Sequence, residues 1–325
     1  MKILVTGGAG YIGSVTTELL LDRHYETVVF DNLEKGHREA VDKRARFIKG
    51  DLRDPDAVNS AVSDVRPDAV IHFAAYALVG ESMENPGLYF RNNVCGGVNL
   101  ADAMLKFDVE KIVFSSTCAV YGHPPAVPIT EQMPRKPVNP YGESKLMFEN
   151  ILRWQASLRG LKAVFLRYFN ACGATDKFGE DHDPETHLIP LVLRVALGLS
   201  EKASVFGKDY DTPDGTCVRD FIHIVDLARA HILALESDAS GAFNLGCGKG
   251  HSVLEVINTA RRVTGRSIPS ETRERRPGDP PELVAAPDKA RKAFNWEPEK
   301  SGLEEIIRTA WDWAREHPAG YGGQG

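Results

Sequence analysis

The glycine-rich segment of residues 6–13, TGGAGYIG, constrains the fold more than any other part of the sequence. It follows KILVT, a short apolar run typical of a strand, and it precedes a segment with the periodicity of a helix. Gly8, Gly10 and Gly13 match the spacing G-x-G-x-x-G, and Gly7, Gly10 and Gly13 match its variant G-x-x-G-x-x-G. Glycines allow a tight turn and a close approach of the backbone to a pyrophosphate, which then lies at the helix N-terminus. The segment therefore predicts a strand, a turn and a helix that bind a dinucleotide.

Six apolar runs follow one another in the first half of the chain, with helical patterns between them. The runs are KILVT, ETVVFD, ARFIKGD, DAVIHFAA, EKIVFSST and KAVFLRYF. Asp54 and Asn139 are expected to cap two of the helices, which are predicted over about 11–23, 55–65, 87–107 and 141–160. Apolar strands separated by helices are typical of a parallel sheet that is covered on both faces. The predicted fold class is therefore α/β, with a doubly wound, Rossmann-like parallel sheet.

The pattern changes after about residue 173, where loops lengthen and short strands mix with helices. Strands are expected at ASVFG and GAFNLG, and helices near 188–198, 225–236, 252–264 and 302–316. This predicts a dinucleotide-binding domain over 1–173 and a smaller α+β substrate-binding lobe over 174–325, with chain segments free to cross back between them. The final AGYGGQG predicts a disordered tail.

The composition excludes several classes of protein. With 42% hydrophobic and 26% charged residues, the chain is that of an ordinary globular protein, and its net charge of −6 argues against a nucleic-acid partner. The five cysteines form no CxxC pair, which favours reduced thiols inside the cell, and the ten histidines have no zinc-type spacing, so no metal is expected. No secretory signal is visible, and the longest apolar window, AVIHFAAYALVG, is too short for a membrane span. The expected location is the cytoplasm.

Carboxylates and small residues follow three of the expected strands. Asp31 ends the second strand, where its carboxylate can accept hydrogen bonds from ribose hydroxyls and repel a 2′-phosphate, which favours NAD over NADP. Asp51 follows the third strand, and it is equally suited to reach the adenine or to cap the approach to the next helix. The fourth strand leads into residues past which a cofactor backbone can lie closely: Phe73, Ala74 and Ala75.

Tyr141 and Lys145 lie four residues apart in the segment NPYGESK, on one side of the expected helix. For an isolated Tyr-x-x-x-Lys, the simpler interpretation is a lysine that lays its stem on apolar surface and keeps its charge in water. The fifth strand, however, ends in Ser115, Ser116 and Thr117, at the edge of the sheet that faces the cofactor cleft. The order of these residues predicts a Ser/Thr–Tyr–Lys catalytic arrangement.

Such a tyrosine needs a lowered pKa if it is to act as a base. The pKa of a free phenol is near 10, so roughly one molecule in a thousand is ionised at pH 7. Lowering the pKa by three units takes about 4 kcal/mol of differential stabilisation of the phenolate. The Lys145 ammonium and the positive nicotinamide ring are expected to supply it, with Lys145 as a solvated and paired charge in a cleft.

Taken together, the motifs resemble the extended short-chain dehydrogenase/reductase family, and within it the nucleotide-sugar 4-epimerases. The resemblance spans nearly the whole chain and is carried by TGGAGYIGS, FDNL, FAAYALVGES, NNV, FSSTCAVYG, NPYGESK, RYFNACGA, DGTCVRDFIHIVDLA, FNLG and RRPGD. It implies an isomerase that interconverts UDP-glucose and UDP-galactose through a 4-keto sugar, with tightly held NAD and a UDP-sugar as substrate. It also implies a homodimer.

The resemblance implies roles for the matching residues. Tyr141 is similar to the general base, Thr117 to the hydroxyl that bonds the sugar O4, and Lys145 to the residue that tunes the base. NAD contacts are implied for Gly7, Gly10, Tyr11, Ile12, Gly13, Asp31, Asn32, Asp51, Leu52, Phe73, Ala74, Ala75, Asn92, Ser115, Tyr141, Lys145 and Tyr168. Contacts with the nucleotide sugar are implied for Thr117, Tyr141, Phe169, Asn170, His187, Leu188, Phe206, Arg219, Arg276, Asp279 and Leu283. Among these, Asn170 and the two arginines match diphosphate ligands, Asp279 matches the ribose contact, and Leu188 and Phe206 match the uracil wall.

Some positions depart from the family pattern. Ala77 replaces a common lysine near the cofactor phosphate, His187 replaces a common asparagine beside the uridine, and Thr117 replaces a serine. Leu283 lies where some members have a tyrosine beside the sugar C2, which leaves room for slower turnover of the N-acetylated sugars.

Three alternatives stay open beside this interpretation. A 4,6-dehydratase on the same scaffold is disfavoured, because Cys118 and Ala119 follow Thr117 where that chemistry typically uses Asp-Glu. A 4-epimerase for another UDP-sugar and a non-catalytic NAD-sensing protein are the others. A sensor can lose the Tyr/Lys pair, which this chain keeps.

Overall fold

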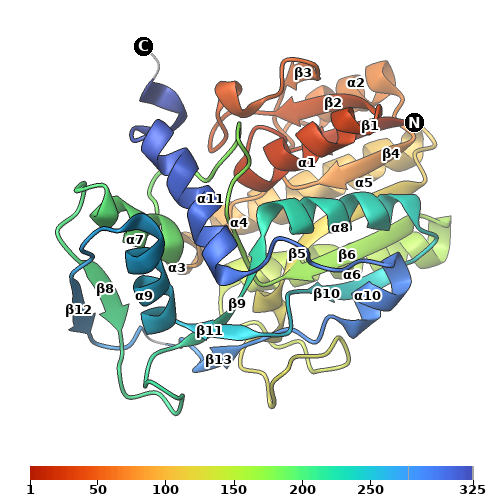
Figure 1. The fold of residues 1–325 in the computed structure, drawn as a ribbon. Coiled ribbons are helices and arrows are strands. Elements are labelled where there is room, and N and C mark those ends of the chain that lie inside the picture. Colours follow the sequence, from red (N-terminus) through yellow and green to blue (C-terminus); the bar gives the residue numbers. More distant parts are fainter. Residues whose placement is uncertain (277, 324–325) are drawn as a thin grey trace.

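The computed structural model, which describes residues 1–276 and 278–323, is built around a seven-stranded parallel sheet (Figure 1). The strands lie in the order β10-β6-β5-β4-β1-β2-β3. Their bounds are β1 (Lys2–Thr6), β2 (Glu26–Asp31), β3 (Arg46–Lys49), β4 (Ala69–His72), β5 (Lys111–Thr117), β6 (Lys162–Tyr168) and β10 (Gly241–Leu245). The strand order reverses between β1 and β4, which is where ligands bind in open sheets of this kind. The predicted α/β class is confirmed.

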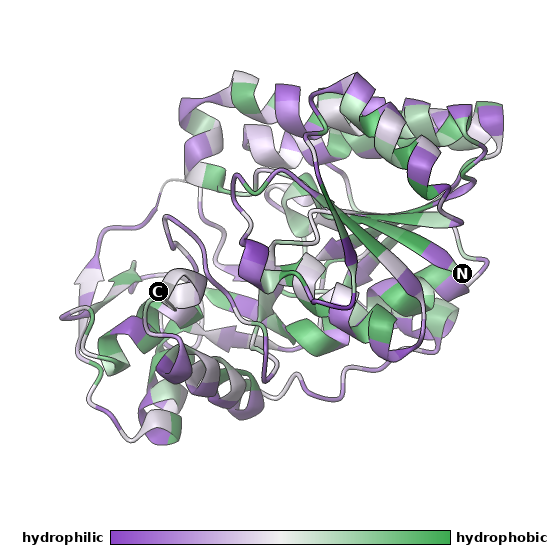
Figure 2. Cartoon of the chain, turned by 90° about the horizontal axis from the view of Figure 1, so that it is seen from above, coloured by the Kyte–Doolittle hydropathy of each residue, from purple (hydrophilic) through white to green (hydrophobic). Residues whose placement is uncertain are grey.

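Helices cover both faces of this sheet. One face packs against α1 (Tyr11–Asp22) and α8 (Ile224–Glu236), and the other against α2 (Pro55–Val65), α5 (Gly96–Lys106) and α6 (Pro140–Arg159). Figure 2 shows the strands as the most hydrophobic layer, with hydrophilic residues on the outer sides of the helices. The predicted caps are present, since Asp54 accepts hydrogen bonds from the first turn of α2 and Asn139 from the first turn of α6.

The expected single helix over 87–107 is divided in the structure. It consists of α4 (Pro86–Tyr89), a π-helical segment Phe90–Cys95 and α5, preceded by a short α3 (Val79–Glu84). The wider π turn contains Asn93, whose buried side chain bonds to the backbone of Tyr76 and to the hydroxyl of Ser144. The spacing of apolar residues predicts a helix but carries no information about tertiary hydrogen bonds such as these. The sequence pattern therefore did not reveal the π-helical break.

The smaller lobe has its own core and sheets. Its strands are β7 (Asn170–Cys172), β9 (Val218–His223), β11 (Gly250–Ser252) and β13 (Glu282–Leu283), with a separate pair formed by β8 (Ala203–Phe206) and β12 (Ser270–Arg273). The helices α7 (Leu188–Ala196), α9 (Val253–Thr264) and α11 (Leu303–Glu316) pack together around an apolar core, while α10 (Asp288–Phe294) contacts β10.

The two lobes are interleaved along the chain. GAFNLG becomes β10, which pairs in parallel with β6 at the edge of the large sheet, and α8 packs on the same sheet. The division into domains at residue 173 stays a prediction. The segments β10 and α8 follow that residue in the chain but pack with the large sheet. None of the described helices is both long and apolar enough to span a lipid bilayer.

The end of the chain is more ordered than expected. Residues Gly320–Gly323 form a short 3-10 helix, and the ring of Tyr321 is buried against Trp313. The backbone N–H of Tyr321 donates to Asp181 at 2.8 Å, and Gly179 donates to the Tyr321 hydroxyl at 3.0 Å. A single aromatic anchor therefore orders this part of the glycine-rich segment, whereas residues 324–325 lie outside the described residues.

Candidate active site

The glycine turn lies at the carboxyl end of β1, and its backbone requires glycine. Gly7 has φ +75°, and a Cβ there would lie 2.4 Å from the Ala74 nitrogen. A Cβ on Gly13 would lie 2.2 Å from the Gly7 carbonyl oxygen, whereas a Cβ on Gly10 would meet only that oxygen, at 3.4 Å. Two glycines are thus needed for internal packing, and the third leaves the outer side of the turn open. This geometry fits the close approach of a pyrophosphate at the start of α1.

Asp31 ends β2 beside this turn. Its Oδ2 accepts the N–H of Ala9 at 3.0 Å and its Oδ1 accepts that of Leu33 at 2.8 Å. Burial raises the pKa of Asp31, while these two backbone donors oppose the rise. The carboxylate is therefore fixed at the sheet edge next to the glycine turn, where a ribose would follow a pyrophosphate.

The other predicted cofactor residues occupy the same edge or support it. The Asn32 amide donates to Asp51 at 3.0 Å, and the Arg53 guanidinium lowers the pKa of Asp51 to about 2. Asp54 caps α2, as predicted, and Asp51 Oδ1 accepts the N–H of Arg53 at 2.8 Å on the approach to that helix, so both interpretations of Asp51 stay open. Residues Phe73 and Ala74 continue β4 with both N–H groups on the Thr6 carbonyl. Tyr11 donates to the Gly173 carbonyl at 2.5 Å, Tyr168 and Ser115 share a hydrogen bond of 2.6 Å, and Ile12 and Leu52 pack into the two cores.

Thr117, Tyr141 and Lys145 come together between β5 and α6. Thr117 is the last residue of β5, where its Oγ1 accepts the N–H of Ala119 at 3.1 Å. Tyr141 lies in the first turn of α6, close enough for the Thr117 hydroxyl to lower the pKa of the phenol. One turn later, Lys145 Nζ donates to the Ser115 carbonyl at 2.8 Å and lies 4.9 Å from the centre of the Phe114 ring. The order of hydroxyl, tyrosine and lysine in the sequence thus becomes a compact group at the carboxyl end of the central strands.

Burial controls the titration of this group. It raises the pKa of Tyr141 well above its usual value, against the opposing effect of the Thr117 hydroxyl, and it lowers the pKa of Lys145 to about 7. Lys145 is only 3% exposed, and none of the described carboxylates forms an ion pair with it. The expectation of a solvated lysine is therefore wrong, whereas its pairing with the phenolate and the cofactor stays a prediction. Its partners are a backbone carbonyl and an aromatic face, and the protein alone does not lower the pKa of the tyrosine.

Apart from Thr117 and Tyr141, the predicted nucleotide-sugar residues lie in the smaller lobe or beside it. Arg219 Nη2 lies 2.5 Å from Asp279 Oδ1, and the Arg276 guanidinium stacks 4.0 Å from the centre of the Phe206 ring. Leu283 packs in one apolar cluster with Phe169, Tyr121 and Ala285. The Asn170 amide donates to the Asp220 carbonyl at 3.0 Å, and Leu188 begins α7. The imidazole of His187 is instead turned towards Glu180 and Glu185.

Pattern reasoning missed Asn93, which supports the helix α6 that carries Tyr141 and Lys145. Its Oδ1 accepts the N–H of Tyr76 at 2.9 Å, and its amide donates to the Tyr76 carbonyl and to Ser144 Oγ, both at 3.0 Å. Ser144 in turn donates to the Tyr141 carbonyl at 2.7 Å. The motif NNV pointed to this place, but the predicted residue was Asn92, whose amide contacts Asn93. The alternation of exposed and buried positions along a π turn could not be inferred from the sequence.

Comparisons with known proteins agree over nearly the full chain. A family model described as "NAD dependent epimerase/dehydratase family" matches residues 3–246. UDP-glucose 4-epimerase of Lacticaseibacillus casei is 50% identical, with 99% of each chain covered. The solved structure of UDP-glucose 4-epimerase from Brucella ovis in complex with NAD is 48% identical, covers 96% of this chain and 98% of its own, and has a TM-score of 0.93. The corresponding structure from Bifidobacterium longum, in complex with NAD+ and UDP, is 38% identical over 99% of this chain and 100% of its own, with a TM-score of 0.94.

Proposed function

The chain belongs to the NAD dependent epimerase/dehydratase family, and we propose that it interconverts UDP-glucose and UDP-galactose with NAD as its bound cofactor. The reaction inverts C4 of the hexose and causes no net oxidation. One observation carries this proposal beyond the family. Thr117, Tyr141 and Lys145 form a compact group at the same sheet edge as the glycine turn, in a chain that is 50% identical to a UDP-glucose 4-epimerase.

Tyr141 is the group that moves the proton. Its phenolate accepts the proton of the sugar 4-hydroxyl, and its phenol returns it to the same oxygen after the sugar has turned over. Thr117 holds that oxygen against the phenol by a second hydrogen bond. Bound NAD would supply the acceptor for the hydride from C4 of the sugar and, in its reduced form, the donor that returns it.

The residues at the carboxyl ends of β1 and β2 suit the adenosine half of NAD. The open side of Gly10 receives the pyrophosphate, while the fixed carboxylate of Asp31 accepts hydrogen bonds from ribose hydroxyls. A second phosphate on that ribose would meet the buried carboxylate, so NAD is favoured over NADP.

The smaller lobe anchors the nucleotide and leaves the sugar free to rotate. Arg219 and Arg276 provide guanidinium forks for diphosphate oxygens, and Asp279 accepts bonds from the uridine ribose. Phe206 supplies an apolar face for the uracil. An enzyme that presents either face of one sugar carbon to the same hydride needs this division between a fixed nucleotide and a mobile hexose.

Proton NMR of the purified protein with UDP-galactose and no added NAD tests the proposal. The anomeric signal of UDP-glucose should appear and both sugars should approach a constant ratio. In Tyr141→Phe the fold and bound NAD should persist, while turnover falls by roughly 100-fold or more. Tyr25→Phe, which removes a surface phenol bonded to Glu236, is the matched control and should keep normal turnover. Normal turnover in Tyr141→Phe would remove the assigned role, and failure of the parent to form UDP-glucose would overturn the function.

We further propose a homodimer in the cytoplasm. On α6, Met147, Trp154 and Leu158 are exposed and lie on one side of the helix, where a second copy could cover them. Multi-angle light scattering should give twice the 35.7 kDa of one chain. Trp154→Glu should shift the particle towards the monomer, and a parent that scatters as a single chain would contradict the dimer.

A further inference from the structure

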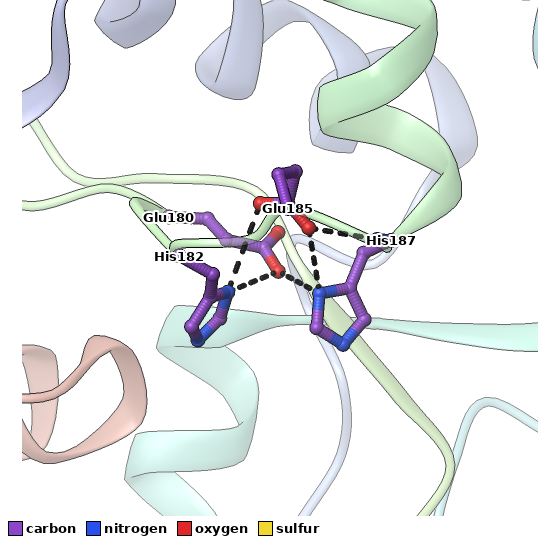
Figure 3. Close-up of side chains that lie close together, drawn as sticks. All are labelled: Glu180, His182, Glu185 and His187. Carbon is purple, nitrogen blue, oxygen red and sulfur yellow. Dashed lines mark hydrogen bonds and ion pairs between the residues drawn. The ribbon is translucent and has the colours of Figure 1, made fainter. Parts of the chain in front are cut away.

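Four side chains of one loop converge outside the catalytic group. Glu180, His182, Glu185 and His187 all lie between β7 and α7, and their carboxylate oxygens and imidazole nitrogens turn towards a common point (Figure 3). His187 Nδ1 lies 2.9 Å from both Glu180 Oε1 and Glu185 Oε1. His182 Nδ1 lies 3.2 Å from Glu180 Oε1 and 3.7 Å from Glu185 Oε2. One ligand atom from each residue can be chosen so that all four lie within 4.8 Å of one another.

These nitrogen–oxygen separations are of the size expected for neighbouring ligands of one metal ion. Zinc bonds of about 2.0–2.2 Å to nitrogen and oxygen place neighbouring ligand atoms about 3.3–3.6 Å apart. The four distances from imidazole nitrogens to one oxygen of Glu180 and to both oxygens of Glu185 run from 2.9 to 3.7 Å and bracket that range. Both rings present Nδ1 to the centre and turn Nε2 away from it (Figure 3), so each can ligate through Nδ1 once the metal has displaced the proton from that nitrogen.

The negative charges of Glu180 and Glu185 must be balanced by groups within the cluster itself. The side chains of Glu180 and Glu185 are only 8% and 7% exposed, and in the described part of the chain neither forms an ion pair with a lysine or arginine. Two buried carboxylates need two positive charges close by. Either two ring protons or one divalent cation can supply them. The half-exposed ring of His187 gives a small ion a route from solvent.

We propose that Glu180, His182, Glu185 and His187 bind one zinc ion in a closed, four-coordinate site. Two imidazoles with two carboxylates favour a transition-metal ion over magnesium or calcium, which prefer all-oxygen sets. Four protein ligands leave no position for substrate or water, which is the arrangement of a structural site. The order Glu-x-His-x-x-Glu-x-His is not one of the familiar zinc spacings, so the sequence alone predicted no metal.

The proposed ion would hold the loop of one lobe against the other. The His182 ring meets Tyr11 edge-on, with 6.1 Å between ring centres, and Tyr11 is the residue that follows the open glycine of the turn. His37, beyond β2, contacts the Asp181 carbonyl at 3.0 Å. Leu188, a predicted uracil contact, directly follows the last ligand. Zinc therefore stabilises a loop that lies between the dinucleotide turn and the nucleotide-sugar lobe.

Metal analysis of the full-length protein tests the site without reference to turnover. Protein purified without an affinity tag or chelator should contain about one zinc per chain by mass spectrometry. After chelation, titration with Co2+ should produce the visible absorption of tetrahedral cobalt, and added zinc should displace it. Glu180→Gln and His182→Gln should each weaken the affinity for zinc by roughly 100-fold or more, because even outer-shell changes cost 10- to 100-fold. His251→Gln is the matched control, since His251 forms another Glu-paired imidazole, 2.6 Å from Glu255.

The outcomes separate a zinc site from a metal-free ion-pair cluster. Stoichiometric zinc in the parent and the control, with loss in both ligand variants, supports the proposal. A parent that binds neither zinc nor cobalt overturns it, as does tetrahedral cobalt absorption that persists in both variants. If a variant does not fold, the cobalt spectrum of the parent decides by itself. Epimerase activity in a protein shown to bind no metal would overturn the zinc site and leave the proposed function intact.

Discussion

Burial disfavours the charged forms of both Tyr141 and Lys145, and both effects oppose the formation of a phenolate beside an ammonium. The phenol keeps its proton more tightly, and the ammonium loses its proton near neutral pH. Of the two positive charges expected to lower the pKa of the tyrosine, the Lys145 ammonium does not offset the effect of burial in the protein alone. A positive nicotinamide ring in the same cleft would act on both groups, favouring the phenolate directly. The base should become competent only when the cofactor is oxidised and bound, which confines proton removal to the productive complex.

Replacing Asp31 should change cofactor selection. Because the carboxylate also accepts two backbone N–H groups, Asp31→Asn is a better probe than alanine, since it keeps an acceptor and removes the charge. Hydrogen bonds to charged groups are worth about 1.5–3 kcal/mol, so the affinity for NAD should fall by roughly 10- to 100-fold, with less loss for NADP. Calorimetric titration of NAD-free protein measures the affinities for NAD and for NADP. Glu26→Gln, at the exposed start of the same strand, should leave the ratio of the two affinities unchanged, and an unchanged ratio in Asp31→Asn would refute the role.

Leu283 should set the tolerance for a group on the sugar C2. It packs with Phe169 in one apolar cluster, and leucine leaves more space than tyrosine. Pockets that differ by a few methylenes discriminate by about 10- to 200-fold, so the parent should turn over UDP-N-acetylgalactosamine at a value of kcat/KM that much below that for UDP-galactose. Leu283→Tyr should abolish the acetylated reaction and spare the other. Leu283→Met serves as the control of similar volume. Acetylated turnover that survives the tyrosine would exclude this position.

The helix α6 carries Tyr141 and Lys145, the proposed catalytic pair, in its first turns and is fixed to the sheet further along. Glu149 accepts from Ser116 Oγ at 2.7 Å and from Arg167 Nε at 2.8 Å, and both partners lie on the strands beneath it. Arg167 also donates a hydrogen bond to the Tyr121 hydroxyl, which in turn donates to Asn244 on β10. This buried network joins the helix of Tyr141 to β5, β6 and β10. It fixes α6, which carries Tyr141, against β5, which carries Thr117.

Removing the charge of Glu149 should destabilise the whole chain. The side chains of Glu149 and Arg167 are 0% and 1% exposed, and breaking a buried pair from one side typically costs about 3–5 kcal/mol. Glu149→Gln should lower the free energy of unfolding by about that amount in urea titrations. Glu305→Gln breaks the surface pair with Arg308 and should cost about 1 kcal/mol or less. A change in Glu149→Gln no larger than in this control would show that the network contributes little.

Most helices and strands could be predicted because the residues that determine them are close in sequence. Features that depend on contacts between distant segments could not be predicted. The caps Asp54 and Asn139 act within three residues, so their helices could be placed from sequence alone. The glycine turn and the Tyr141–Lys145 spacing are equally local. The position of β10 depends on β6, more than seventy residues earlier, and the burial of Lys145 depends on Phe114 and Ser115 on another strand. The Glu/His cluster was missed for a different reason, since its spacing matches no familiar ligand pattern.

Buried neutral histidines should make the whole molecule sensitive to mild acid. Burial lowers the pKa of His72 to about 3 and those of His223 and His231 to about 4. The unfolded chain binds these protons near pH 6.5, so unfolding takes up protons and stability falls as the pH drops from about 6.5 towards 4. Each site contributes up to about 3 kcal/mol at pH 4. Tm measured from pH 7.5 to 4.5 should therefore decrease steeply.

One variant isolates this effect. His231→Gln removes a titrating group inside α8 and should flatten the dependence of Tm on pH, even if Tm at pH 7.5 is lower. His24→Asn, at an exposed position after α1, should leave the slope unchanged. Equal slopes in the parent and His231→Gln would show that acid acts elsewhere.

The edge position of β10 has a consequence for synthesis on the ribosome. β6 ends at Tyr168 and its outer neighbour begins only at Gly241, so residues 169–240 must be translated before the large sheet can close. At 5–20 residues per second this takes roughly 4–14 s. Throughout that interval the nascent β6 offers unpaired backbone groups to any other strand in reach. A translational pause within residues 169–240 would therefore lengthen the time in which nascent chains on one message can pair with one another instead of with their own last strand.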